Sequence, residues 1–193
     1  LEGVQIVAGH IRDLGISAAN PRHGILGAVR YDAGRGLADH RDWLAQEFNY
    51  DVTLLDRPAL AQHVTSSSYH QALHDQNAFH FDPLAYCLGL ARAAIAAGAT
   101  IHEATPADCI DGRQGQWKIT TPQGKITARE VVVTTGGYTD RLLPELHRAF
   151  LPIATYVMIS KANPTLIAKA IHTTSAIGDD RRAGDYYRLA DNG

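Results

Sequence analysis

A run of three valines that ends in small residues constrains the fold of this chain most strongly. Val131–Val133 is followed by Thr134, Thr135, Gly136, Gly137 and Tyr138. A continuous β-branched run is typical of a strand buried on both faces, as in a parallel sheet covered by helices. Small residues let a ligand approach the backbone, and ligands of open α/β sheets collect beyond the carboxyl ends of strands. The run therefore indicates contact with a dinucleotide, and an ordinary strand-to-loop turn is the alternative.

Periodicity and capping residues predict a mixed α/β fold. The best-marked helix lies between Asp82 and Gly98, because Asp82 is a good N-cap, Pro83 suits the first helical position and glycine follows the end. Its three-four spacing predicts a buried face of Leu84, Cys87, Leu88, Ala91, Ala94 and Ile95. Further helices are expected over residues 1–14 and 37–48, in a short stretch capped by Asp56, and after Asn163. The helix over 37–48 should bury Leu37, Trp43, Leu44 and Phe48.

Strands are expected over residues 25–31, 52–55, 99–103, 131–133, 150–160 and 184–190. A hairpin is predicted where 117–121 and 125–128 flank Pro122-Gln123-Gly124, and a turn is predicted at 75–77. These expected elements divide into three parts, residues 1–75, 76–149 and 150–193, with the hairpin in the middle part.

Charge and apolar patterning exclude several classes of protein. The 18 basic and 20 acidic residues leave a formal charge of −2, so no basic face for nucleic acid is predicted. No apolar run approaches the ~18 residues of a transmembrane helix. Cys87 and Cys109 have no close cysteine partner, which favours a reducing, cytoplasmic setting. The 193 residues begin without methionine and without a signal-peptide pattern, and we expect the chain to be a fragment.

Several short motifs occur in a recognisable order. Phe81-Asp82-Pro83 opens a helix, Thr105-Pro106-Ala107 follows the next expected strand, and the valine run comes after a tryptophan-bearing hairpin. Leu143-Pro144 and the stretch 185–189 continue the series. From about His23 to its end, the chain resembles the D-amino-acid-oxidase-like family of FAD-dependent oxidoreductases. Within that family it is similar to γ-glutamylputrescine oxidoreductases.

The resemblance implies that residues 76–149 form part of a Rossmann-like FAD-binding layer, and that residues 1–75 and 150–193 form parts of a substrate domain with an antiparallel sheet. It also implies contacts with FAD in the full-length parent. The implied residues are Thr105, Ala107, Thr134, Thr135, Gly136, Gly137 and Tyr138. Ala107 stands where the family usually has valine, which implies a looser contact. The Gly-x-Gly-x-x-Gly fingerprint that receives the pyrophosphate is absent, since Gly34-Arg35-Gly36 lacks the third glycine. The family places that fingerprint upstream and its flavin-covering segment downstream, so we expect this fragment to be inactive alone and to hold no FAD.

The resemblance also implies hydride transfer from the carbon that bears the substrate amine to the flavin. D-Amino acids, sarcosine or glycine are alternative substrates to γ-glutamylputrescine, and a non-catalytic binding domain is the alternative from another class. The two-residue period of a strand places Tyr156 with Met158, and Tyr186 with Arg188, as candidate substrate-binding residues. Arg188 would clamp a carboxylate, and an exposed rim arginine is the other interpretation. No catalytic base is predicted.

The remaining polar clusters have simpler interpretations. His63, His70, His74 and His80 lie close in sequence but lack fixed metal-ligand spacing, so no metal site is predicted. The stretch 179–182, Asp-Asp-Arg-Arg, is interpreted as a solvated loop. Unpaired sheet edges in a fragment would favour self-association.

Overall fold

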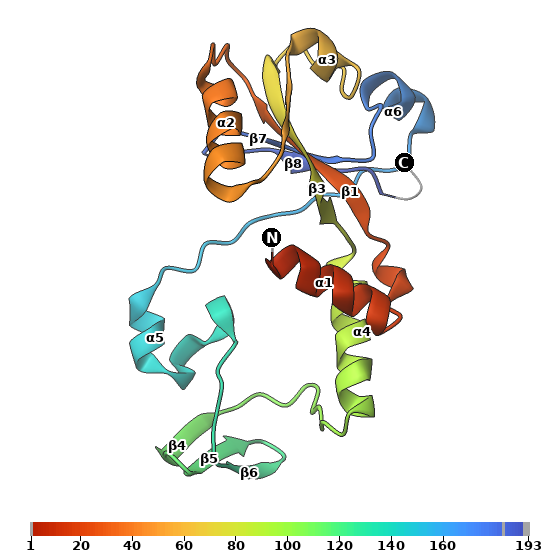
Figure 1. Cartoon of the computed structure of the whole chain (residues 1–193). Coiled ribbons are helices and arrows are strands. Elements are labelled where there is room, and N and C mark those ends of the chain that lie inside the picture. The colour runs from red at the N-terminus through yellow and green to blue at the C-terminus, as the bar shows by residue number, and fades with distance from the viewer. Residues whose placement is uncertain (1, 183, 191–193) are drawn as a thin grey trace. The chain divides into compact units, whose positions relative to one another are not determined.

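The computed structural model describes residues 2–182 and 184–190 and shows a mixed α/β chain, which confirms the predicted fold class. Contacts between Cα atoms divide the chain into two compact units (Figure 1). The first unit comprises residues 1–99 and 160–193, and the second comprises residues 100–159. The chain therefore leaves its first unit once and returns to it.

A five-stranded sheet forms the centre of the first unit. Its strands are β1 (Arg22–Val29), β2 (Thr53–Leu55), β3 (Gln71–His80), β7 (Ala176–Asp179) and β8 (Tyr186–Tyr187), in the order β2-β3-β1-β7-β8. β1 pairs antiparallel with β3, with Leu26 opposite His74, and parallel with β7, with Ile25 opposite Ala176. β1 is thus the strand through which sequence-distant segments join.

The turn predicted at residues 75–77 is wrong, because β3 continues through it. Asp75 lies opposite Ile25, beside an irregularity in register between His23 and Ile25. One oxygen of the Asp75 carboxylate accepts the backbone N–H groups of Asn77 and Ala78, at 2.9 and 3.1 Å. These local bonds are the ones that an Asx-turn would make, and here they occur within the strand.

Apolar side chains from alternate strand positions form the core against one face of this sheet. Leu26 and Ile177 are the largest side chains that are almost fully buried. The other members of the cluster are Ala28, Leu55, Leu60, Val64, Tyr69 and Ala72. Burial of the strand members of this cluster fixes the register, since a slip by one residue would turn Leu26, Ala72 and Ile177 to the other face.

Five helices accompany the sheet in the first unit: α1 (Glu2–Asp13), α2 (Gly36–Phe48), α3 (Arg57–Ala61), α4 (Pro83–Ala96) and α6 (Pro164–Ala170). A one-turn 3-10 helix, η1 (Ser17–Ala19), follows α1. The predicted N-caps are confirmed. The carboxylates of Asp56 and Asp82 each accept a backbone N–H at 2.9 Å, and the Asn163 side chain accepts one at 3.1 Å.

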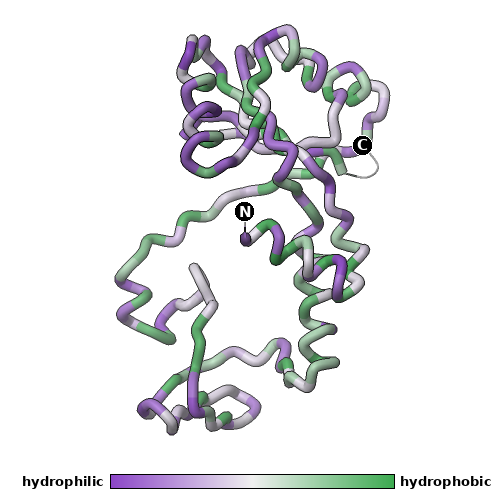
Figure 2. Tube along the Cα trace, viewed as in Figure 1, coloured by the Kyte–Doolittle hydropathy of each residue, from purple (hydrophilic) through white to green (hydrophobic). Residues whose placement is uncertain are grey.

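The buried face predicted for α4 is wrong. Leu84, Leu88 and Ile95 are 66%, 46% and 56% exposed, although Figure 2 shows that α4 is rich in hydrophobic residues. Cys87 is also exposed, and Ala91 and Ala94 are half-buried. The helix buries Gly89 instead, and Tyr86 and Leu90 pack on a small cluster of Ile11, Ile16 and Ala19. The apolar spacing therefore identified a different face of α4 from the buried one, and Leu84, Leu88 and Ile95 on that face are exposed among the described residues.

The predicted burial of α2 is wrong in part. Trp43 and Phe48 are 49% and 55% exposed and contact each other edge to face, with ring centroids 5.0 Å apart. Leu37 and Leu44 are half-buried. The helix therefore covers its two leucines better than its two large aromatic side chains.

An antiparallel sheet of three strands forms the second unit's regular part: β4 (Cys109–Arg113), β5 (Gln116–Thr121) and β6 (Gly124–Ala128). The predicted hairpin is confirmed, and Ile110, Ile119 and Ile126 lie side by side across the strands. Beyond the sheet, η2 (Gly136–Tyr138), η3 (Asp140–Leu142) and α5 (Pro144–Ala149) are single helical turns.

Three expected strands are absent from the described residues: 99–103, 131–133 and 150–160. The expected strand over 184–190 is reduced to Tyr186–Tyr187. Val132, Tyr156 and Met158 are 84%, 88% and 92% exposed. A strand needs a neighbour to satisfy its backbone hydrogen bonds, and no described strand lies beside these segments. Among the described helices, none is long and apolar enough to cross a membrane.

Candidate substrate and cofactor sites

An arginine–histidine pair joins Arg188, the residue after β8, to His80, the last residue of β3. Arg188 Nη1 is 2.8 Å from His80 Nδ1, and His80 Nε2 is 2.8 Å from the carbonyl oxygen of Thr174. A guanidinium only donates and a carbonyl only accepts, so Nδ1 must accept and Nε2 must carry the proton. The network therefore specifies one neutral tautomer of His80 and holds Arg188 in place.

This pair lines a pocket of about 130 Å³ in the first unit. The lining residues are Ala18, Asn20, Arg22, His80, Asp82, Arg188, Leu189 and Ala190. The Asp82 carboxylate in this lining accepts the Ala85 N–H of the α4 cap. The guanidinium of Arg188 is the kind of group that binds a carboxylate through two parallel hydrogen bonds.

The two tyrosines of β8 point to opposite sides, as the strand period predicts. Tyr186 is 68% exposed, whereas Tyr187 packs on the core and donates from its hydroxyl to the Tyr69 hydroxyl at 3.3 Å. Burial, together with the hydrogen bond to Tyr69, raises the pKa of Tyr187. Tyr187 is thus a structural anchor that stays protonated, and Tyr186 remains free to meet a ligand.

The small residues after the valine run form a hydroxyl-bonded turn in the second unit. The Thr139 hydroxyl donates to the Gly136 carbonyl at 2.7 Å and is 2.6 Å from the Thr135 hydroxyl. Gly136 has φ +53°, a backbone conformation that glycine adopts without strain. Thr134, Thr135, Gly136 and Gly137 are exposed, and Tyr138 is 95% exposed. Sequence reasoning missed Thr139, which is only 3% exposed and holds this turn together.

The other predicted contacts lie on irregular backbone of the same unit. The Thr105 hydroxyl donates to the Glu103 carbonyl at 2.8 Å, and Ala107 is half-buried. Tyr156 and Met158 also belong to this unit, whereas Tyr186 and Arg188 belong to the first. Of the predicted substrate residues, the structure places Arg188 in a pocket, and it supplies His80 as a partner that sequence reasoning had weighed only as a metal ligand.

Two of the histidines, the buried His74 and the half-buried His63, contact each other. His74 is 7% exposed, its Nε2 lies 3.2 Å from the Ser175 hydroxyl, and its ring meets that of His63 with centroids 5.2 Å apart. Burial, and next the charge of His63, lower the pKa of His74. Within residues 2–182 and 184–190, no three His, Cys, Asp or Glu side chains are grouped to hold a metal ion.

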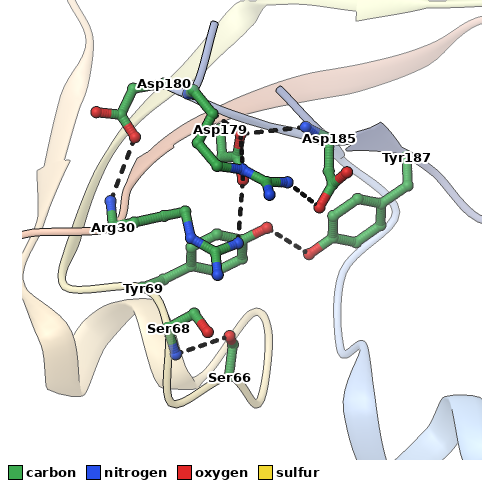
Figure 3. Close-up of polar contacts among 9 residues, drawn as sticks. Arg30, Ser66, Ser68, Tyr69, Asp179, Asp180, Asp185 and Tyr187 are labelled. Carbon is green, nitrogen blue, oxygen red and sulfur yellow. Dashed lines mark hydrogen bonds and ion pairs between the residues drawn. The ribbon is translucent and has the colours of Figure 1, made fainter. Parts of the chain in front are cut away.

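The interpretation of 179–182 as a solvated loop is wrong for Asp179, whose side chain is fully enclosed, 0% exposed. Figure 3 shows its carboxylate among Arg30, Asp185 and the tyrosine pair. The neighbouring Asp180 is exposed, as expected. A run of four charges gives no sign that one of them is covered; the nearby Gly184 was the one hint of close packing.

The fold of this chain is similar to the folds of two solved structures, an L-proline dehydrogenase and a glycine oxidase. The whole chain superposes on L-proline dehydrogenase from P. horikoshii with TM-score 0.74, at 14% identity, over 52% of that chain. Similarly, 74% of it superposes on 39% of glycine oxidase from Geobacillus kaustophilus, with TM-score 0.62 and 18% identity.

The chain belongs to the family described as FAD dependent oxidoreductase (DAO), which matches residues 1–193. A curated relative, "Probable oxidoreductase OrdL" from Haemophilus influenzae, is 31% identical over 154 residues. That match covers 76% of this chain and 36% of the relative, so the chain spans about a third of the relative's length.

Proposed function

We propose that the complete protein carrying this sequence oxidises an amine or amino acid by hydride transfer to FAD, with a substrate of the γ-glutamylputrescine type. Membership of the DAO family supports the reaction class. The observation that supports the substrate class is the Arg188–His80 pair in its pocket, with Nη1 and Nδ1 2.8 Å apart. γ-Glutamylputrescine offers a carboxylate at one end and an amine at the other, so one end suits this pocket.

The residues proposed to contact the cofactor fit that task by exposure and size. The backbone from Thr134 to Tyr138 is accessible, and Gly136 and Gly137 carry no side chain that would keep a ligand away. Thr105 and Ala107 are proposed to contribute contacts from the same unit. When bound, FAD supplies the acceptor for a hydride from the amine-bearing carbon.

The residues of this chain would contribute to the reaction by orienting the substrate. Arg188 has more donors than its single bond to His80 requires, so it can still bind a carboxylate through two parallel hydrogen bonds. Holding the carboxylate end of the substrate fixes how far from Arg188 the amine-bearing carbon lies. The exposed ring of Tyr186 would cover the chain between the two ends. Tyr156 and Met158 are proposed as further substrate contacts.

Other substrates remain alternatives within the same reaction class. D-Amino acids, sarcosine and glycine also carry a carboxylate, and the similar solved structures include a glycine oxidase and an L-proline dehydrogenase. A non-catalytic binding domain is the alternative from another class. Flavin absorbance and turnover by the complete protein would separate the two classes.

The role of Arg188 can be tested by comparing two substrates that differ in their carboxylate. In the complete protein, Arg188→Met should raise KM for γ-glutamylputrescine roughly 10- to 100-fold, the value of a charge-assisted bond, and leave KM for putrescine unchanged. Arg182→Met removes an exposed arginine of the neighbouring turn and should change neither value. An equal effect of Arg188→Met on both amines, or no effect, would contradict the carboxylate pocket.

A further inference from the structure

The Asp179 carboxylate gathers hydrogen bonds from three separate segments. One oxygen accepts the backbone N–H groups of Arg181 and Asp185, at 3.3 and 3.1 Å. The other accepts Nη1 of Arg30 at 3.3 Å and Nε of Arg181 at 3.0 Å (Figure 3). Arg30 follows β1, Arg181 lies in the turn, and Asp185 directly precedes β8. One side chain thus connects the sheet to the start of its last strand.

This carboxylate is ionised although it is enclosed. Burial opposes its ionisation, but the hydrogen bonds from Arg181, Arg30 and Asp185 outweigh that effect and lower the pKa of Asp179. Opening the turn would take these hydrogen bonds away from the covered carboxylate, so the bonds oppose opening of the turn.

The turn around Asp179 has little freedom. The Asp179 N–H donates to the Asp185 carbonyl at 3.0 Å, and the side chains of Arg181 and Asp185 form an ion pair. A Cβ at Gly184 would lie 2.8 Å from the Asp179 carbonyl oxygen, so no larger residue fits without a shift. On the other side, Arg30 lies over the Tyr69 ring at 6.0 Å, and Tyr69 meets the hydroxyl of Tyr187.

β8 depends on this turn for its position. It is the last strand in the order of the sheet and pairs with β7 at two positions, Ile177 with Tyr187 and Gly178 with Tyr186. So short a strand has few ladder bonds of its own to define where it lies. We propose that Asp179 is a positioning residue that fixes β8, and with it Tyr186 and Arg188, for substrate binding. The part of this inference that concerns substrate binding rests on the proposed function. The part that concerns the position of β8 does not.

Two asparagine variants of the complete protein separate this role from a general loss of charge. Asp179→Asn removes the enclosed carboxylate, whereas Asp180→Asn removes the same charge from the exposed neighbour, which accepts the Arg30 backbone N–H at 3.3 Å. Asp179→Asn should speed hydrogen exchange of the Asp185, Tyr186 and Tyr187 amides by about tenfold or more, as a locally opened segment does. Asp180→Asn should leave them near wild type.

Steady-state kinetics on the same variants address the part that concerns substrate binding. Asp179→Asn should raise KM for γ-glutamylputrescine with little change in kcat, because binding geometry is lost and the flavin contacts are untouched; Asp180→Asn should change neither. If Asp179→Asn does not fold, Arg181→Ala removes part of the same network and should show both effects more weakly.

The outcomes are distinguishable. Exchange that is unchanged in Asp179→Asn, or equally fast in Asp180→Asn, overturns the positioning role whatever the substrate is. Faster exchange with unchanged KM shows that Asp179 fixes β8 but that β8 does not bind this substrate, which counts against the proposed function instead.

Discussion

Gly89 occupies the point at which α4 crosses Ile16. A Cβ at position 89 would lie 2.4 to 2.8 Å from the side-chain carbons of Ile16. We expect Gly89→Ala to destabilise the protein by about 1–3 kcal/mol through overpacking, although alanine favours a helix by up to ~1 kcal/mol. Urea denaturation measures the difference.

Gly9 of α1 provides the matched control. The nearest atom to a Cβ there is 3.8 Å away, which is ordinary contact. Gly9→Ala should therefore be neutral or stabilising by up to ~1 kcal/mol. Equal effects of the two substitutions would show that α4 does not pack on Ile16 through this face.

The buried His74 should make stability fall in acid. Burial and the charge of His63 lower its pKa in the folded state, whereas the unfolded chain titrates near about 6.5. Stability is therefore fully present above that value and is lost as pH falls through the folded-state pKa, because the unfolded chain binds the proton first.

Replacing His63 with asparagine should make the stability of the protein less sensitive to acid. His63→Asn removes a positive neighbour of His74, so unfolding free energy should fall less between about pH 7.5 and about pH 5 than in wild type. His102→Asn, at an exposed site in the other unit, serves as the control. The same pH dependence in wild type and His63→Asn would contradict the coupling of the two rings.

At the level of elements, neighbouring residues in the sequence were sufficient to predict a helix or a hairpin, because such an element satisfies its own backbone hydrogen bonds. Asp82 with Pro83, Asp56 and Asn163 each predicted a helix start that the structure shows. The β5–β6 hairpin was equally predictable, because its two strands are adjacent in sequence. The enclosed carboxylate of Asp179 and the Arg188–His80 pair were not, since both join residues far apart in the chain.

Strands that need distant partners were predicted least well. Residues 131–133 have the β-branched pattern of a buried strand, yet Val132 is 84% exposed and the segment has no described neighbour. The exposed run therefore gives no support for a dinucleotide site at the tip of a buried strand. The family membership stands on the match over residues 1–193.

The same segment yields a prediction about the complete protein. If the valine run is a strand of a parallel sheet there, the amides of Val131, Val132 and Val133 should exchange slowly, since each would bond to a neighbouring strand. In the isolated 193-residue chain they should exchange quickly. Equally fast exchange in the complete protein and in the isolated chain would show that these valines form no strand in either.

At the scale of the whole molecule, the two units divide the proposed work. The residues proposed to contact FAD lie in residues 100–159, and the Arg188 pocket and its Asp179 support lie in the other unit. Because the chain spans about a third of its curated relative, chemistry can be assigned only to the complete protein. The sequence predicted a substrate part from residue 150 onward, whereas Tyr156 and Met158 lie in the unit of residues 100–159.

Anaerobic reduction of the flavin tests the central claim most directly. The complete protein, purified with FAD bound, is mixed with γ-glutamylputrescine without oxygen, and the visible absorbance of the flavin is followed. We expect the absorbance to bleach as hydride is transferred. In Arg188→Met, a higher substrate concentration should be needed for the same bleaching, because the variant binds the substrate more weakly. A protein that takes up no FAD, or a flavin that stays oxidised with γ-glutamylputrescine, D-amino acids, sarcosine and glycine alike, would contradict the account.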